Sequence, residues 1–183
     1  MSDVALVEGI PKKPEWWVHP HLAPPPADFR IVVDTREQTP LFRPEGHPHV
    51  PGPPFHAWAV PGTLGEGDYS LQGFTDLVRI ERKSLSDLFG SCGSSRERFE
   101  REYVRLTSIP TRILLIEANY RSVVDPDPRE YSGRMNPTSV EGTILGWWND
   151  YGVFPVFATD HRYAARWTFR YLALWFQRHG EEL

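Results

Sequence analysis

The chain has 183 residues, of which 40% are hydrophobic, and this is enough for one globular domain with a sizeable core. Its formal net charge of -4 and pI near 6.0 exclude an overall basic field, so any contact with nucleic acid must come from a local basic patch. The one cysteine, Cys92, excludes an internal disulfide, and without a signal peptide or an apolar run near ~20 residues we expect a cytoplasmic chain outside the membrane.

Residues 1–28 are rich in proline, with a run of three at residues 24–26, and we interpret them as an N-terminal tail. Trp16 and Trp17 lie in this tail. Two adjacent tryptophans rarely stay solvated, so we expect them to dock on the chain's own surface or on a partner. The folded domain is expected over residues 29–183.

Within that domain, short segments rich in β-branched residues predict strands at residues 29–34, 55–60, 68–72, 77–83, 112–118 and 153–158. The third and fourth of these are predicted to pair as a hairpin. A proline-, glycine- and histidine-rich loop separates the first two strands. The pattern therefore indicates a sheet assembled from short, partly buried strands.

Helices are predicted between and after these strands. Residues 94–109 place apolar side chains at i, i+4 and i+7, which is the spacing of an amphipathic helix. Asn136 as cap and Pro137 at the first position predict a second helix, and a third is expected from about residue 161 to 178. The order of elements implies an α/β fold, with a mixed β-sheet flanked by α-helices and catalytic groups at strand ends.

The end of the predicted strand 77–83 carries an unusual group of charges. Residues 80–88 read "IERKSLSDL", in which two acids and two bases lie close together. Of the 20 basic residues 17 are arginine, and Lys83 is the one lysine outside the tail. A lysine in so arginine-biased a chain indicates a need for its smaller, deprotonatable ammonium group, with chance survival as the alternative.

Side chains alternate along a strand, so Glu81 and Lys83 are predicted to share one face of the sheet, opposite to Arg82. Asp68 begins the paired strand and is expected to converge on them across the hairpin. The neighbouring strand ends in one acid and is followed three residues later by another. The predicted cluster contains one amine and four carboxylates: Lys83, Asp34, Glu37, Asp68 and Glu81.

Clustered carboxylates repel one another unless a cation lies between them, and oxygen-only ligands suit Mg²⁺ or Mn²⁺. Such a site is suited to phosphate chemistry, with the metal polarising the phosphodiester and Lys83 orienting a water molecule or stabilising the developing charge.

These residues also have simpler explanations. The charges at 81–83 would suit an ordinary solvated strand end, and Ser84 and Asp87 fit a helix capping box as well as a metal site. Arg36 would pair with Glu37 or another nearby acid. Three histidines, His47, His49 and His56, would suggest zinc, but a surface loop is the better explanation for a proline-rich segment without a cysteine partner.

Several motifs, in this order, resemble the nuclease domain of the XPF/Mus-type structure-selective endonucleases: "VDTREQTPL", "GDYSL", "IERKSLSDL" and "RERFEREYVRL". The resemblance runs from about Arg30 to the C-terminus. With "NPTSVEGTI" before the last strand, the chain is most similar to the compact bacterial and phage members, which implies a host cytoplasm.

The resemblance implies a restriction-endonuclease-like fold and metal-dependent hydrolysis of branched or structured DNA (flaps, forks, junctions) in repair, recombination or replication. The residues it assigns to catalysis are Asp34, Glu37, Asp68, Glu81, Lys83 and Asp87. The metal ligands for Mg²⁺ or Mn²⁺ are Asp34, Asp68 and Glu81. The DNA-binding residues are Arg36, Arg82, Arg98 and Arg105.

The chain departs from this family in two ways. Glu102 stands where many relatives have glutamine, and it would also form an ion pair with Arg98 at i+4. No tandem helix-hairpin-helix module follows the nuclease motifs. The alternative to an active endonuclease is a catalytically silent DNA-binding or scaffold subunit, although such a subunit would have no reason to retain mutually repelling carboxylates. A third possibility is a restriction-like or resolvase enzyme that shares only the fold.

The last predicted helix is apolar over about 240° of its circumference, well beyond the ~100° that one core requires. One side carries Trp167, Tyr171, Leu174 and Trp175, and the other carries Ala165, Phe169, Leu172 and Phe176. We therefore expect a homodimer through this helix and the helix from Pro137, with coverage by the tail tryptophans as the alternative.

Overall fold

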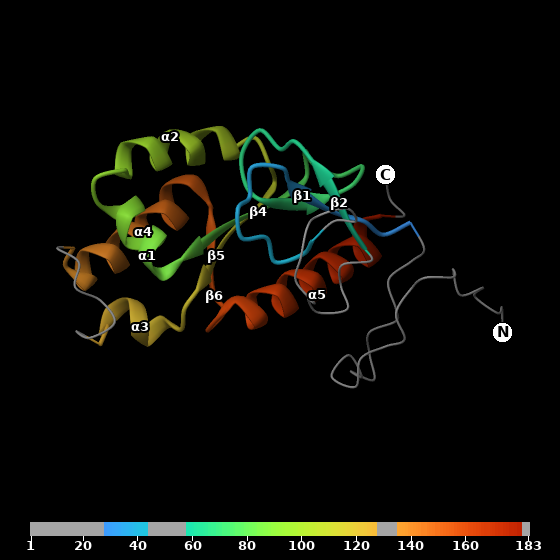
Figure 1. The fold of residues 1–183 in the computed structure, drawn as a ribbon. Coiled ribbons are helices and arrows are strands. Elements are labelled where there is room, and N and C mark those ends of the chain that lie inside the picture. Colours follow the sequence, from blue (N-terminus) through green and yellow to red (C-terminus); the bar gives the residue numbers. More distant parts are fainter. Residues whose placement is uncertain (1–27, 44–57, 128–134, 181–183) are drawn as a thin grey trace.

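The computed structural model of the protein describes residues 28–43, 58–127 and 135–180 (Figure 1). The expected tail, including Trp16 and Trp17, lies outside the described residues, and so do the three loop histidines at positions 47, 49 and 56.

Six strands form one mixed sheet with the order β2-β1-β3-β4-β5-β6. They are β1 (Ile31–Asp34), β2 (Ala59–Gly62), β3 (Tyr69–Leu71), β4 (Val78–Ser84), β5 (Thr111–Glu117) and β6 (Phe154–Phe157). β3 runs antiparallel to both β1 and β4, as the predicted hairpin requires, and the other pairs are parallel. The predicted mixed sheet is confirmed.

Five helices are present in the described residues: α1 (Leu85–Cys92), α2 (Arg96–Leu106), α3 (Tyr120–Val124), α4 (Pro137–Tyr151) and α5 (His161–His179). The Asn136 side chain caps α4, and Pro137 opens it, as predicted. α1 begins directly after β4, at the Ser84 cap that the sequence allowed, whereas α3 after β5 was not predicted. None of the helices in the described part of the chain is long and apolar enough to cross a membrane.

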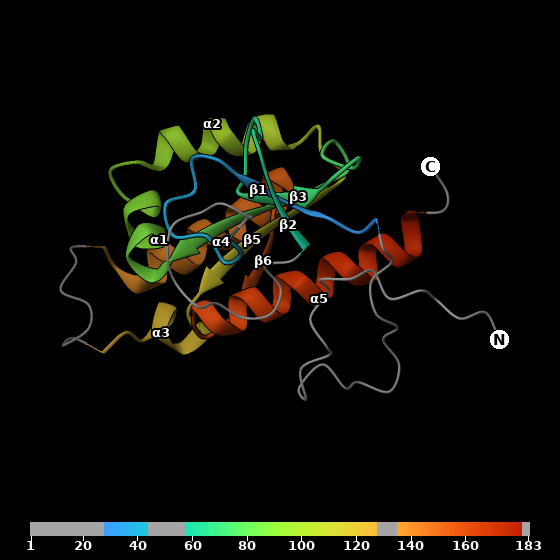
Figure 2. The same ribbon diagram turned by 45° about the vertical axis from the view of Figure 1, so that its right-hand side comes forward.

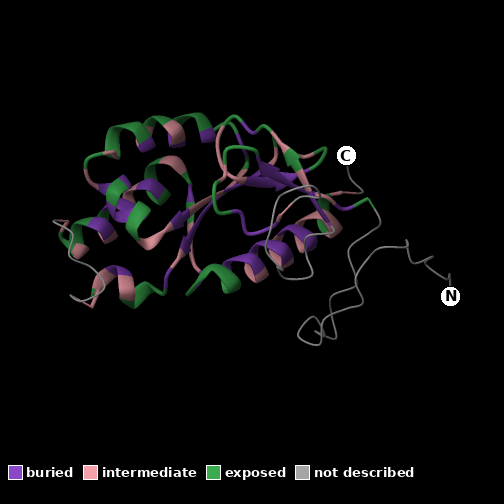
Figure 3. Ribbon diagram, viewed as in Figure 1, coloured by how far each residue is buried: buried purple, intermediate pink, exposed green. Residues whose placement is uncertain are grey.

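The helices cover the two faces of the sheet unequally (Figures 1 and 2). α5 lies along one face, where Phe169 and Leu172 pack into a core with Ile80 and Leu115. α1, α2 and α4 lie on the other face, over a second core with Leu114 at its centre. Figure 3 shows the buried side of each helix turned toward the strands. Strand residues on opposite faces, such as Leu114 and Leu115, therefore belong to different cores.

The strand directions bring the motif residues to one edge of the sheet. β1, β4 and β5 are mutually parallel, so Asp34, Ser84 and Glu117 end their strands at the same edge. β3 runs the other way, and Asp68, just before it, reaches this edge too. Catalytic groups in α/β proteins commonly lie at such an edge, where loops carry side chains beyond the strands.

Candidate active site

A pocket of about 490 Å³ opens at this edge, between the loop after β1, the end of β4, and helices α1 and α2. We call it the β4 pocket. Among its lining residues are most of those predicted from the sequence: Arg36, Glu37, Asp68, Glu81, Arg82, Lys83, Asp87 and Arg98. Asp34 and Arg105 do not line it.

Glu81 and Lys83 lie on the same face of β4, as their spacing predicted. The ammonium group of Lys83 is in contact with Oε1 of Glu81 and lies 3.9 Å from the centroid of the Phe99 ring. Lys83 is buried, with a relative exposure of 6%. A cation held over an aromatic ring and beside one carboxylate has a fixed position, which is what a lysine needs in order to orient a reacting group.

The carboxylate of Asp68 completes the acidic side of the pocket. Its Oδ2 accepts a hydrogen bond of 2.7 Å from the backbone N–H of Arg82. Burial raises the pKa of Asp68 well above its ordinary value, and the nearby carboxylates of Glu81 and Glu37 raise it further. A cation bound beside Asp68 would offset this burial and this repulsion, so the arrangement favours the binding of a cation.

Arg82 points to the opposite face of β4, as predicted, and is enclosed there by two acids. Its Nη2 lies 3.0 Å from Oε1 of Glu37, and its Nη1 lies 3.0 Å from Oε1 of Glu117. Only 8% of the Arg82 side chain is exposed. We call Glu37, Arg82 and Glu117 the Arg82 cluster. Arg82 lines the β4 pocket, but its guanidinium donates to Glu37 and Thr39 and contacts Glu117, so protein groups already occupy the donors that a DNA phosphate would need.

Asp34 has partners of its own outside the pocket. Its Oδ1 accepts hydrogen bonds from the backbone N–H and the Nε of Arg36, at 2.9 and 2.8 Å, and its Oδ2 accepts one of 2.6 Å from the backbone N–H of Leu64. Burial raises the pKa of Asp34, but these hydrogen bonds outweigh it and leave the pKa below the ordinary value. Asp34 thus holds the loop after β1 to the loop after β2, and the structure does not bring it to Asp68 and Glu81 as a shared ligand.

Asp87 lies in the first turn of α1. The hydroxyl of Ser84 accepts a hydrogen bond from the backbone N–H of Asp87 and donates one of 2.7 Å to its Oδ2. The capping interaction that the sequence allowed is therefore present. Because Asp87 also lines the β4 pocket, capping does not remove it from the site.

The remaining predicted arginines are exposed. Arg98 borders the pocket with 64% of its side chain exposed, 3.9 Å from Glu102. Arg36 also borders the pocket, while its guanidinium donates to Asp34 and to the carbonyl of Leu64. Arg105 lies away from the pocket and is paired with Glu66. Arg98 and Arg36 are thus the arginines placed to meet a phosphate at the pocket.

The donor set of the pocket fits a hard divalent cation. In the described residues no three Asp, Glu, His or Cys side chains converge closely enough to hold a metal ion. Asp68 and Glu81 nevertheless provide two carboxylates, and burial together with neighbouring acids raises the pKa of Asp68. Mg²⁺ is commonly bound by one or two carboxylates together with waters and phosphate oxygens, so a site with two protein ligands suits it.

Sequence reasoning missed Glu117 and Phe99 as parts of this site. Phe99 is a buried residue on the apolar face of α2, and its ring also contacts the Lys83 ammonium group. Glu117 ends an otherwise apolar strand, "TRILLIE", and a charged residue in that position was the available signal. Neither contact is visible without knowing that β5 pairs with β4 and that α2 packs beside it.

Comparison with known proteins agrees with this geometry. Residues 27–171 match the ERCC4 domain family, which is more than half of the chain. The chain belongs to the ERCC4 domain family. Among solved structures, it is similar to XPF from Aeropyrum pernix in complex with DNA, with a TM-score of 0.58 and 24% identity over 81% of this chain. It is also similar to XPF from Aeropyrum pernix in a second structure, with a TM-score of 0.57 and 24% identity over 83% of this chain.

This ERCC4 domain spans 65% of the first of those XPF chains and 67% of the second. At 24% identity the likeness establishes the fold, that of an XPF-type nuclease domain, which is restriction-endonuclease-like as predicted. No curated protein sequence matches the chain.

Proposed function

We propose that this ERCC4 domain is a divalent-metal-dependent endonuclease that hydrolyses phosphodiester bonds in branched or structured DNA. The observation that carries the proposal is the β4 pocket itself. Asp68 and Glu81 place two carboxylates on one wall, where burial and neighbouring acids raise the pKa of Asp68, and Lys83 is held between Glu81 and Phe99. Membership of the ERCC4 family and the XPF-like fold support the same chemistry.

In this proposal Asp68 and Glu81 hold Mg²⁺ or Mn²⁺. The bound cation supplies two effects, polarisation of the scissile phosphodiester and a lower pKa of a bound water. Lys83 holds the attacking oxygen or stabilises the negative charge that develops on the phosphate. The attacking water loses a proton to the solvent as its oxygen forms a bond to phosphorus, the opposite P–O bond breaks, and the leaving oxygen takes up a proton from the solvent.

DNA would reach the pocket along its exposed rim. We propose that Arg98 and Arg36, which border the pocket and are largely exposed, contact phosphates of the bound DNA. With a formal net charge of -4 the chain has no general attraction for DNA, so these local arginines must provide it. The similar archaeal XPF was solved in complex with DNA, which supports DNA as the ligand here. Flaps, forks and junctions, as in repair, recombination and replication, are the proposed substrates.

The competing function is a catalytically silent subunit that only binds DNA or a protein. The retained carboxylates argue against it, because a silent chain gains nothing from neighbouring acids that raise the pKa of the buried Asp68.

One experiment separates the two functions. Labelled flap, fork, nicked, gapped, junction and linear DNAs would be incubated with the chain and Mg²⁺ or Mn²⁺, beside its Glu81→Gln variant as the control for contaminating nuclease. We expect cleavage of branched DNAs that depends on both the metal ion and Glu81. Binding without metal-dependent cleavage would establish the silent subunit instead, and equal cleavage by Glu81→Gln would remove the pocket as its source.

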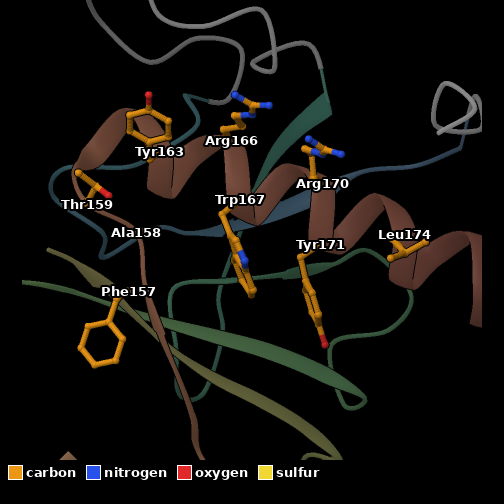
Figure 4. Close-up of a pocket in the computed structure, with 9 residues that line it drawn as sticks. All are labelled: Phe157, Ala158, Thr159, Tyr163, Arg166, Trp167, Arg170, Tyr171 and Leu174. Atoms are coloured by element: carbon orange, nitrogen blue, oxygen red, sulfur yellow. The ribbon is translucent and has the colours of Figure 1, made fainter. Parts of the chain in front are cut away.

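We also propose that the chain is a homodimer. A groove of about 500 Å³ lies between the end of β6 and the part of α5 from Tyr163 to Leu174 (Figure 4). The rings of Trp167 and Tyr171 line it and are stacked, with their centroids 4.9 Å apart. Arg166 and Arg170 also line the groove, and Figure 4 shows their side chains turned away from these rings. Tyr163, which also lines the groove, is 52% exposed.

The edge strand β6 connects this groove to further exposed apolar groups. Phe154 of β6 is 49% exposed, and Trp148 and Leu145 of α4 are 46% and 51% exposed. A surface of this kind, at the open edge of a sheet, is suited to a second copy of the same chain. Light scattering at micromolar concentration should give twice the chain mass, and Trp148→Glu should return the mass to that of a monomer.

The alternative is that Trp16 and Trp17 of the tail cover this surface. If a chain without residues 1–28 still has the mass of a dimer, the tail tryptophans do not provide the cover. The deletion also tests the proposed division into a tail and a domain over 29–183, which the start of the family match at residue 27 supports.

A further inference from the structure

Glu117 contacts one residue of strand β4 and one residue of helix α5. It is the last residue of β5, and only 11% of its side chain is exposed. Its Oε1 lies 3.0 Å from Nη1 of Arg82 and 2.7 Å from Nδ1 of His161, the first residue of α5. Because an ionised carboxylate only accepts hydrogen bonds, Nδ1 is the nitrogen of His161 that carries the proton. Glu117 thus connects the start of α5 to the end of β4.

The Arg82 side chain is held on separate edges by the two acids of its cluster. Nε and Nη2 donate to Glu37 at 3.2 and 3.0 Å, and Nη1 faces Glu117. Nη2 donates in addition to the hydroxyl of Thr39 at 3.0 Å. A guanidinium bound on both edges has one orientation, whereas a guanidinium bound on one edge is free to turn about its stem.

Arg82 is also the residue whose backbone shapes the pocket. Its N–H donates to Asp68, and its chain neighbours on either side are Glu81 and Lys83, which point to the opposite face. A shift of the β4 end would therefore move Glu81 and Lys83 together and displace the N–H that binds Asp68. Pairing with β5 holds the backbone of β4, and the contacts of the Arg82 side chain with Glu37 and Glu117 hold the strand end from the other face.

We propose that Glu117 is a positioning residue of the β4 pocket, acting through Arg82 to keep Asp68, Glu81 and Lys83 aligned for phosphodiester hydrolysis. The inference rests on the proposed function for the meaning of that alignment. It assigns to Arg82 the task of fixing the strand end, in place of the phosphate contact that the sequence resemblance implied.

The test compares Glu117→Gln with two controls in the full chain. Glu100→Gln removes an exposed acid paired with Arg96 on α2, and Asn136→Ala loosens α4 by removal of its cap. In single-turnover cleavage with saturating Mn²⁺ and DNA, Glu117→Gln should lower the rate by at least ~10-fold, as loss of an outer partner of a metal site does. Its Kd for DNA should be unchanged, and both controls should keep the parental rate.

A double-mutant cycle separates positioning from general loss of stability. Glu37→Gln should lower the rate as Glu117→Gln does, and the double variant should lose less than the product of the two effects, because both acids act through one guanidinium. The proposal would be overturned if the rate loss of the double variant equalled the product of the two single losses. It would also be overturned if Asn136→Ala lowered the rate as much as Glu117→Gln does.

Amide hydrogen exchange gives a readout that needs neither metal nor cleavage. The Arg82 N–H is bound to Asp68, so its exchange rate reports on the β4 end directly. Glu117→Gln should accelerate this exchange, and Asn136→Ala should not. If the unaltered chain cuts none of the DNAs, the proposed function fails, whereas an unchanged Arg82 exchange rate in Glu117→Gln would refute the positioning link by itself.

Discussion

Two groups of charged side chains lie on opposite faces of the same strand end and differ in how their charges are balanced. In the Arg82 cluster every charge has a partner within the protein, and little of it is exposed. In the β4 pocket the acids raise the pKa of Asp68, and the pocket is open to solvent. Glu81 and Arg82 are neighbours in sequence, but Glu81 belongs to the pocket that we propose to bind ligands. Arg82 belongs to the ion-paired cluster that supports the end of β4.

The largest expected effect comes from breaking the Arg82 cluster. Arg82→Met would leave Glu37 and Glu117 facing each other with no cation between them, in surroundings where their side chains are only 7% and 11% exposed. Loss of one partner of a buried ion group costs about 3–5 kcal/mol of unfolding free energy. Urea denaturation followed by circular dichroism would measure it. The control is Arg96→Met, which breaks an exposed ion pair with Glu100 on α2 and should cost less than about 1 kcal/mol; a similar loss in both variants would mean that burial of the Arg82 cluster adds nothing to its stability.

A smaller effect, on rate and not on stability, is expected at Lys83. Lys83→Arg keeps the positive charge but replaces a compact ammonium by a planar group that releases no proton at working pH. If Lys83 positions the attacking oxygen, single-turnover cleavage at saturating Mg²⁺ should fall by at least ~10²-fold. A purely electrostatic role predicts a modest loss. Cleavage at the parental rate would remove Lys83 from the chemistry.

The two aspartates should show opposite dependences of stability on pH. Asp34 has a lowered pKa, so it stabilises the fold above the ordinary carboxyl pKa, and this stability is lost as the pH falls through the pKa of the folded state. Asp34→Asn should therefore lose about 1–2 kcal/mol at neutral pH, and the difference from the parent should shrink in acid.

Asp68 has a raised pKa, so its ionisation destabilises the fold as the pH rises from the ordinary carboxyl pKa through the higher folded value. Asp68→Asn should be more stable than the parent at neutral pH and should lose this advantage in acid. Denaturation of both variants between pH 3 and pH 8 would test the pair. If both variants changed the free energy of unfolding in the same direction at neutral pH, the two carboxylates would not differ as the structure indicates.

The smallest expected effect concerns the turn that presents Asp68. Gly67 has φ of +78°, and a Cβ atom there would lie 2.6 Å from Cγ of Arg79. Gly67→Ala should cost about 1–2 kcal/mol from backbone strain and crowding. The matched control is Gly142→Ala on the exposed face of α4, where a Cβ meets nothing within 4 Å and the helix should gain roughly 0.5–1 kcal/mol. Thermal unfolding of both would show whether the sign differs as expected.

The sequence by itself determined the features that depend on local periodicity. Alternation along β4 placed Glu81 and Lys83 together and Arg82 opposite, because side chains on a strand change face at every residue. The cap before α4 and the Ser84–Asp87 pair followed from hydrogen bonds between residues two or three positions apart. These patterns, with the family motifs, were sufficient for the fold class and for the location of the pocket.

Only the tertiary structure decided which charged side chains are free to bind a ligand and which are bound by other groups of the protein. The path of the loop after β2 decides whether Asp34 binds a metal or instead accepts hydrogen bonds from Arg36 and Leu64. The enclosure of Arg82 requires β5 to lie parallel to β4, with Glu117 at the end of β5. A charged side chain has no fixed partner in the sequence, since several opposite charges lie within its reach. Packing selects among them, because burial makes an unpaired charge costly and so fixes the one arrangement in which each buried group finds its partner.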